Sequence, residues 1–149
     1  MKKYAHKIGA VFYVLWGLLH VLGGVAIMSE HNTAAQIAMQ STALQPDSFM
    51  DISSPALSGI LSYHGFNIIW FGVFAIVVGI FYNWKNSKGG YWLNLAVLSA
   101  IELGLIIFLL LPGYMSLSDG GIGLSLFILA LIFSTIGVRQ AESKAFAPA

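Results

Sequence analysis

The fold follows from residues 91–111, which read YWLNLAVLSAIELGLIIFLLL and carry a single charged side chain, Glu102. A helix needs about 20 predominantly apolar residues to cross the hydrocarbon core of a bilayer, and this stretch is long enough. A strand of a membrane barrel would be about 10 residues long and would alternate apolar with polar side chains, which this stretch does not do. The stretch therefore predicts a transmembrane helix.

Three further stretches have the same character: residues 8–28, about 58–82 and 122–138. The chain has 149 residues, of which 58% are hydrophobic and 9% charged, whereas soluble domains carry about 25% charged residues. We therefore expect an all-α integral membrane protein, a bundle of four transmembrane helices that forms one membrane domain over residues 1–149. We expect its partner to be the lipid bilayer. A second copy of the chain, or a larger membrane complex, is an open alternative as a further partner.

Composition also excludes several classes of function. The chain contains no Cys, which removes disulfide scaffolds, thiolate metal sites and thiol redox chemistry. Its formal net charge is +1, so it lacks the basic surface that binding of a nucleic acid requires.

The basic residues predict the orientation. All seven Lys and Arg lie before the first span, in the loop 83–90, or after the fourth span, and an even number of spans puts these regions on one side. Loops rich in Lys and Arg stay in the cytoplasm. We therefore expect both termini to be cytoplasmic, in a membrane of the bacterial inner (plasma) membrane type.

The loops differ in length and character. Residues 83–90 form a short turn, which makes the second and third spans antiparallel neighbours. The first outer loop, residues 29–56, is much longer, and its segment TAAQIAMQSTAL (33–44) favours a short amphipathic helix on the membrane surface. A loop of this length is either functional or a lid over the outer end of the bundle. On the same side, the run Asp119-Gly120-Gly121 predicts a turn before the fourth span.

Ionisable residues inside the spans indicate a candidate site, because a charged side chain at mid-helix costs about 2.5–3.5 kcal/mol on insertion scales. With a rise of 1.5 Å per residue, His20, His64 and Glu102 fall at similar depths in the outer leaflet, on three different spans. Inward side chains at one depth converge in a four-helix bundle. We expect a buried pocket that opens outward. Its expected residues are His20, His64, Asn67, Glu102, Trp16 and Tyr13, with Asp119 at the mouth.

Four interpretations of this pocket stay open. The first is a satisfied polar network that fixes helix register, and the second is a site for a small hydrophobic or amphiphilic molecule. The third is a metal or haem site. Two His and a carboxylate (His20, His64 and Glu102) match a zinc or non-haem iron ligand set, and two His could bind haem. The fourth is an acid–base enzyme or proton-coupled transporter that uses His20 and Glu102.

The layout resembles small four-helix membrane families such as the DoxX-like proteins and the sterol-isomerase-like (EXPERA) group. In the latter, a His on one helix and acidic residues on others line a lipid pocket, and Trp16, His20 and Glu102 are similar in kind. The resemblance covers topology, and it carries no residue roles over to this chain.

Our leading hypothesis is a small membrane protein whose outer-leaflet pocket binds a hydrophobic or amphiphilic molecule or lipid. A metal- or haem-binding redox subunit is the first alternative, and a structural or accessory subunit of a membrane complex is the second. Whether the protein is an enzyme stays open at this point.

Overall fold

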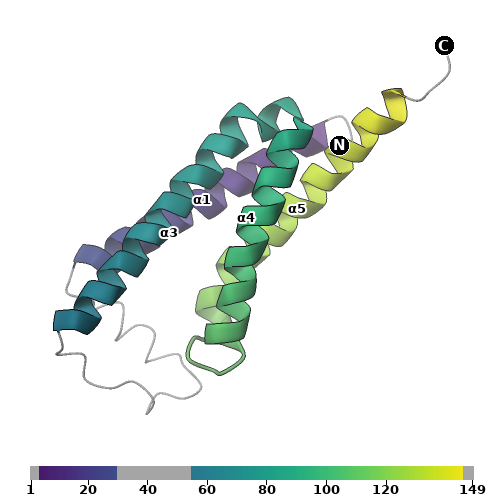
Figure 1. The fold of residues 1–149 in the computed structure, drawn as a ribbon. Coiled ribbons are helices and arrows are strands. Elements are labelled where there is room, and N and C mark those ends of the chain that lie inside the picture. The colour runs from purple at the N-terminus through teal and green to yellow at the C-terminus, as the bar shows by residue number, and fades with distance from the viewer. Residues whose placement is uncertain (1–3, 30–54, 146–149) are drawn as a thin grey trace.

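The computed structural model describes residues 4–29 and 55–145 of the chain, and Figure 1 shows their arrangement. Four long helices form the bundle: α1 (Ala5–Ser29), α3 (Pro55–Phe81), α4 (Lys88–Leu105) and α5 (Leu117–Ala145). All four spans are long and apolar enough to cross a membrane, and the described residues contain no strand. The predicted all-helical membrane fold with four spans is confirmed. The surface helix predicted for residues 33–44 lies outside the described residues.

The third span changes its helical geometry toward its C-terminal end. After Leu105 the chain continues as a π-helix, η4 (Ile106–Leu110), in which the Leu111 N–H bonds to the Ile106 carbonyl at 2.9 Å. The sequence had predicted one uniform helix to Leu111. A π turn is rare, and where one occurs it is frequently beside a functional site. This one begins one helical turn beyond Glu102.

The fourth span begins earlier than the sequence predicted. The Asp119 N–H bonds to the Ser116 hydroxyl oxygen at 3.2 Å, and that hydroxyl donates to the Asp119 carboxylate at 2.8 Å. This reciprocal cap starts α5 at Leu117 and places Asp119 in its first turn, where a carboxylate also faces the positive end of the helix dipole. The prediction of a turn at Asp119-Gly120-Gly121 is therefore wrong, because the cap outweighs the helix cost of two glycines.

Helix α1 is the centre of the bundle and packs against α3 on one side and α5 on the other. Its contact with α3 is made backbone to backbone at glycines. A Cβ added at Gly17 would lie 2.5 Å from the Gly72 carbonyl oxygen, and one added at Gly72 would lie 2.5 Å from the Gly17 carbonyl oxygen. Gly24 and Gly65 oppose each other in the same way, two turns along. The two helices approach this closely because neither has a side chain at these positions.

Helix α4 closes the bundle with larger side chains. Asn94, Leu98 and Glu102 lie on one face of α4 at four-residue spacing, and all three are buried. Leu98 belongs to the same core cluster as Tyr13 and Trp16 of α1, which are 0% exposed, and Glu102 is hydrogen-bonded to Trp16. The outward faces are strongly apolar, with examples such as Leu22, Phe108 and Leu111, as expected for a surface whose solvent is lipid.

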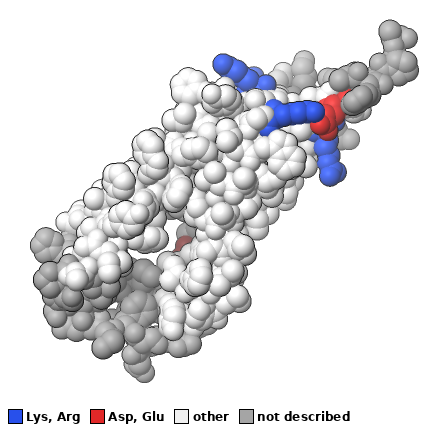
Figure 2. Space-filling model, in the orientation of Figure 1, with Lys and Arg blue, Asp and Glu red and all other residues white. Residues whose placement is uncertain are grey.

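The hairpin between α3 and α4 is held by polar contacts. It contains a short 3-10 helix, η3 (Asn83–Lys85), followed by Asn86 in the left-handed conformation with φ 56°. The Asn86 side chain donates to the Gly137 carbonyl of α5 at 2.9 Å, and Asn94 donates to Asn83 at 3.0 Å. On the face drawn in Figure 2, the Lys and Arg side chains gather at this end of the bundle.

Candidate functional site

The strongest polar contact inside the bundle joins α1 to α4. The Trp16 indole N–H donates to Oε1 of Glu102 at 2.5 Å. Trp16 is 0% exposed and Glu102 is 2% exposed. The second carboxyl oxygen of Glu102, Oε2, is buried and has no hydrogen-bond partner among the described residues. Buried polar atoms in proteins are almost always paired, and among the described residues Oε2 shares the unpaired state with Tyr13 Oη, Asn94 Oδ1 and Ser134 Oγ.

His20 lies against Trp16, one helical turn along α1. The two rings stack with their centroids 3.5 Å apart and an interplanar angle of 22°. Nδ1 of His20 lies 2.8 Å from the Trp16 carbonyl oxygen. Because a carbonyl oxygen can only accept, Nδ1 carries the hydrogen, and in the neutral ring the other nitrogen, Nε2, is then an acceptor. Within the described residues Nε2 makes no hydrogen bond.

Helix α5 completes the site with a glycine. A Cβ added at Gly123 would lie 3.2 Å from Cε1 of His20 and 3.7 Å from Oε1 of Glu102. His20 and Glu102 thus meet in front of the bare backbone of Gly123, and α1, α4 and α5 each contribute one wall. Gly123 was not among the residues predicted for the site. Its signal is the seven-residue spacing of Gly123, Ala130 and Gly137, which keeps small residues on the face of α5 that packs against α1.

The structure places the other predicted site residues around this centre. Tyr13 is fully buried in the core, one turn from Trp16 toward the hairpin end. His64 is exposed on α3 and Asn67 is partly buried. Gly65, next to His64, packs on Gly24, so His64 lies about one turn farther from the hairpin end than His20.

The structure also tests the predicted place of Asp119 and the predicted set of metal ligands. Asp119 is exposed in the first turn of α5 and accepts a hydrogen bond from Ser116. The described residues contain no group of three or more His, Asp or Glu that could hold a metal ion, so His20, His64 and Glu102 do not form one ligand cluster.

The site lies on the side where the bundle opens. In Figure 1, α3 and α4 are close at their hairpin and spread apart toward their other ends. His20 is only partly buried, and Phe71 on α3 is 36% exposed. An acidic side chain is visible between the spread helices in Figure 2, well away from the basic end.

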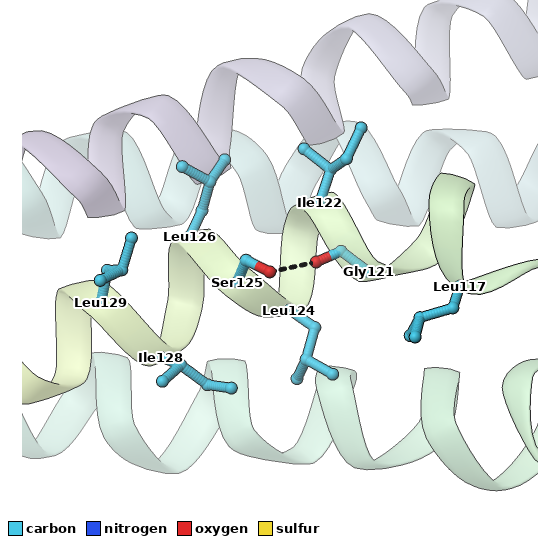
Figure 3. A pocket seen from close by; sticks show the side chains of 8 residues that line it. All are labelled: Leu117, Gly121, Ile122, Leu124, Ser125, Leu126, Ile128 and Leu129. Carbon is cyan, nitrogen blue, oxygen red and sulfur yellow. Dashed lines mark hydrogen bonds between the residues drawn. The ribbon is translucent and has the colours of Figure 1, made fainter.

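An apolar groove of about 480 Å³ lies elsewhere, along α5 from Leu117 to Leu129. Figure 3 shows that its lining side chains all come from this one helix and that the Ser125 hydroxyl is bonded back to the Gly121 carbonyl, at 2.7 Å. Because the hydrogen of that hydroxyl is already used, the lining side chains offer apolar contact and no free donor that would select a ligand. We therefore place the candidate site at Glu102, His20 and Gly123.

Comparisons of the chain with protein-family models, with curated proteins and with solved structures find no match. The resemblance of its layout to the DoxX-like and EXPERA groups therefore stays an expectation from topology, and function has to be argued from the site.

Proposed function

We propose that this protein binds a hydrophobic or amphiphilic small molecule or lipid in the outer half of the bundle. The polar end of the ligand would lie at Glu102 and His20, and its apolar part would lie between the spread halves of α3 and α4. Ligand sites in bundles are mostly apolar, with a few convergent polar groups that fix orientation. Glu102 and His20 would be those groups, in front of Gly123.

The observation that carries this proposal is the unpaired Oε2 of Glu102. A partly satisfied buried carboxyl weakens a bundle, and a bound molecule that pairs with Oε2 would remove that cost. Trp16 satisfies one oxygen only. The other oxygen, together with Nε2 of His20, is available to a bound molecule.

A metal-binding function is the second candidate. His20 donates Nδ1–H to a backbone carbonyl, which is how proteins orient a histidine that ligates through its other nitrogen. Glu102 would supply a second ligand. Further ligands would be needed, because the described residues provide no third His, Asp or Glu at this point. The amphiphile proposal needs no additional group, and we favour it for that reason.

We further propose that both termini are cytoplasmic, in a membrane of the bacterial inner membrane type. The support is the charge distribution: the described basic residues belong to the hairpin end, and Asp119 lies at the opposite end of α5. The site at Glu102 would then face the outer leaflet.

The test is to identify what co-purifies with the protein. Wild-type protein, His20→Phe and the control Trp70→Phe would be purified in mild detergent, extracted with organic solvent and analysed by mass spectrometry, with metal content measured on the same samples. Trp70 is 63% exposed on α3, so its replacement leaves the site intact. We expect an amphiphile at near one copy per chain in wild type and Trp70→Phe, and its loss in His20→Phe. Equal lipid profiles in all three proteins would overturn the proposal, and a stoichiometric metal lost in His20→Phe would establish the second candidate instead.

A further inference from the structure

The hydrogen-bonding capacity of the site defines the polar end of the ligand. This step rests on the amphiphile function proposed above and adds the chemical class of the molecule. Three kinds of lipid-like molecule are to be distinguished: those that end in an anion, those that end in a cation and those that end in a neutral hydroxyl. The hydrogen-bond partners that the structure describes for Glu102 and His20 distinguish between these three kinds of head group.

Burial of Glu102, which is 2% exposed, favours its neutral acid form over the carboxylate. A carboxylate at this depth would carry an insertion cost of about 2.5–3.5 kcal/mol, and its one hydrogen-bond donor among the described residues is the uncharged indole of Trp16. The described Lys and Arg belong to the hairpin end. In the neutral acid, Oε1 accepts from Trp16 as the carbonyl oxygen, and Oε2 carries the hydrogen and is a free donor.

His20 supplies the complementary acceptor. Its Nδ1–H is used by the Trp16 carbonyl, at 2.8 Å, which leaves the lone pair of Nε2. The site therefore offers one free donor, on Glu102, and one free acceptor, on His20. A hydroxyl group donates one hydrogen and accepts one, so it satisfies both atoms at once.

The same arrangement disfavours charged head groups. An alkylammonium has three donors and no acceptor, so it would leave the Glu102 hydrogen unpaired. The ring that could hold a cation by its π face is Trp16, which is fully buried and covered by His20. A carboxylate or phosphate would be buried with no described Lys or Arg beside it, which is costly in a membrane.

We propose that the ligand is a lipid alcohol, a long-chain molecule whose hydroxyl accepts from Glu102 and donates to Nε2 of His20. This rests on the unpaired Oε2 of Glu102 and the free Nε2 of His20, which belong to two side chains that both reach Gly123, through Oε1 of Glu102 and Cε1 of His20.

The test compares three head groups carried by the same 16-carbon alkyl chain. A photoreactive diazirine hexadecanol would be bound to the full-length protein in nanodiscs, and unlabelled hexadecanol, hexadecylamine and palmitate would compete for it. We expect hexadecanol to compete at least about 10-fold better than the other two, since one unmatched hydrogen bond is worth roughly that factor. Amine or acid competing as well as the alcohol would overturn the inference.

Two variants of Glu102 sharpen the result. Glu102→Gln keeps both functions of the neutral acid, because its amide oxygen accepts from Trp16 and its NH₂ donates, so hexadecanol binding should stay within about 3-fold. Glu102→Leu removes the donor and should weaken hexadecanol binding about 10-fold. Loss of binding in Glu102→Gln, with tight binding of hexadecylamine to wild type, would show an ionised Glu102 and a cationic ligand. The amphiphile function would then stand while the alcohol would not. If hexadecanol, hexadecylamine and palmitate all fail to bind the wild-type protein and no amphiphile co-purifies, both proposals fail together.

Discussion

Trp16 and Glu102, 86 positions apart in the chain, are joined by a 2.5 Å hydrogen bond inside the bundle. The bond ties α1 to α4 at a level where the two helices make no close backbone approach, and it fixes one carboxyl oxygen while the other stays unpaired. The geometry of the candidate site depends on this contact, because His20 in turn stacks on the Trp16 ring.

Trp16→Phe tests how much the contact contributes. The substitution keeps an aromatic ring for His20 to stack on but removes the N–H, so Oε1 of Glu102 is left buried without its donor. We expect a loss of about 1–2 kcal/mol in the free energy of unfolding, because an orphaned buried acceptor costs more than an average hydrogen bond in a membrane. Thermal unfolding in detergent measures it, with Trp70→Phe as control. A variant as stable as wild type would show that the bond contributes nothing.

Gly72→Ala tests the backbone contact between α1 and α3. The new Cβ would meet the Gly17 carbonyl oxygen at 2.5 Å, which forces the helices apart. We expect a destabilisation of about 1–3 kcal/mol. Gly104→Ala is the matched control, because a Cβ there meets nothing within 4 Å. This control should be neutral or stabilised by up to about 1 kcal/mol through better helix propensity. Equal melting of the two variants would contradict the packing described for α1 and α3.

The hairpin turn gives a prediction about Asn86, which has φ 56° and donates to the Gly137 carbonyl. Asn86→Gly loses the hydrogen bond but adopts the left-handed backbone freely, so we expect a change within about 0.5 kcal/mol. Asn86→Ala loses the bond and strains the backbone, and we expect it to cost about 1–2 kcal/mol. The ordering of the two melting temperatures is the readout. If Asn86→Ala melted above Asn86→Gly, the account of this turn would be wrong.

The absence of Cys makes the orientation testable by single-cysteine labelling. Ser118→Cys and Lys85→Cys place exposed thiols at opposite ends of the bundle. A membrane-impermeant maleimide added to intact cells should label Ser118→Cys and leave Lys85→Cys unlabelled until the membrane is opened. The reverse pattern would place the termini outside and the site in the inner leaflet.

The four spans could be predicted from the sequence because the bilayer requires each crossing segment to satisfy its own backbone hydrogen bonds. The length and apolar character of residues 91–111 were sufficient for that. The start of α5 could not be placed in the same way. Asp119-Gly120-Gly121 is typical of a turn, and the cap from Ser116 that makes it helical depends on side-chain geometry.

The candidate site was partly accessible to sequence reasoning. Counting helical rise placed His20, His64 and Glu102 at similar depths, and in the structure His20 and Glu102 meet at Gly123. His64 is exposed instead, because depth does not tell which face of α3 a residue occupies, and it is the neighbouring Gly65 that packs on Gly24 of α1. The close approach of Gly17 to Gly72 and of Gly24 to Gly65 sets this arrangement. The sequence signal for this close approach is a seven-residue spacing of glycines, shared by Gly17 and Gly24 on α1 and by Gly65 and Gly72 on α3. A GxxxG motif within one span would have a four-residue spacing instead.

Binding of a lipid alcohol at Glu102 and His20 is tested most directly by mapping crosslinks. The probe is a photoreactive lipid alcohol with its diazirine close to the hydroxyl. The protein in nanodiscs would be irradiated, digested and mapped by mass spectrometry, for wild type and for Glu102→Leu. We expect adducts concentrated around His20 and Glu102 in wild type and lost in the variant. Adducts spread over lipid-facing residues such as Leu22 and Phe108, and unchanged in Glu102→Leu, would contradict it.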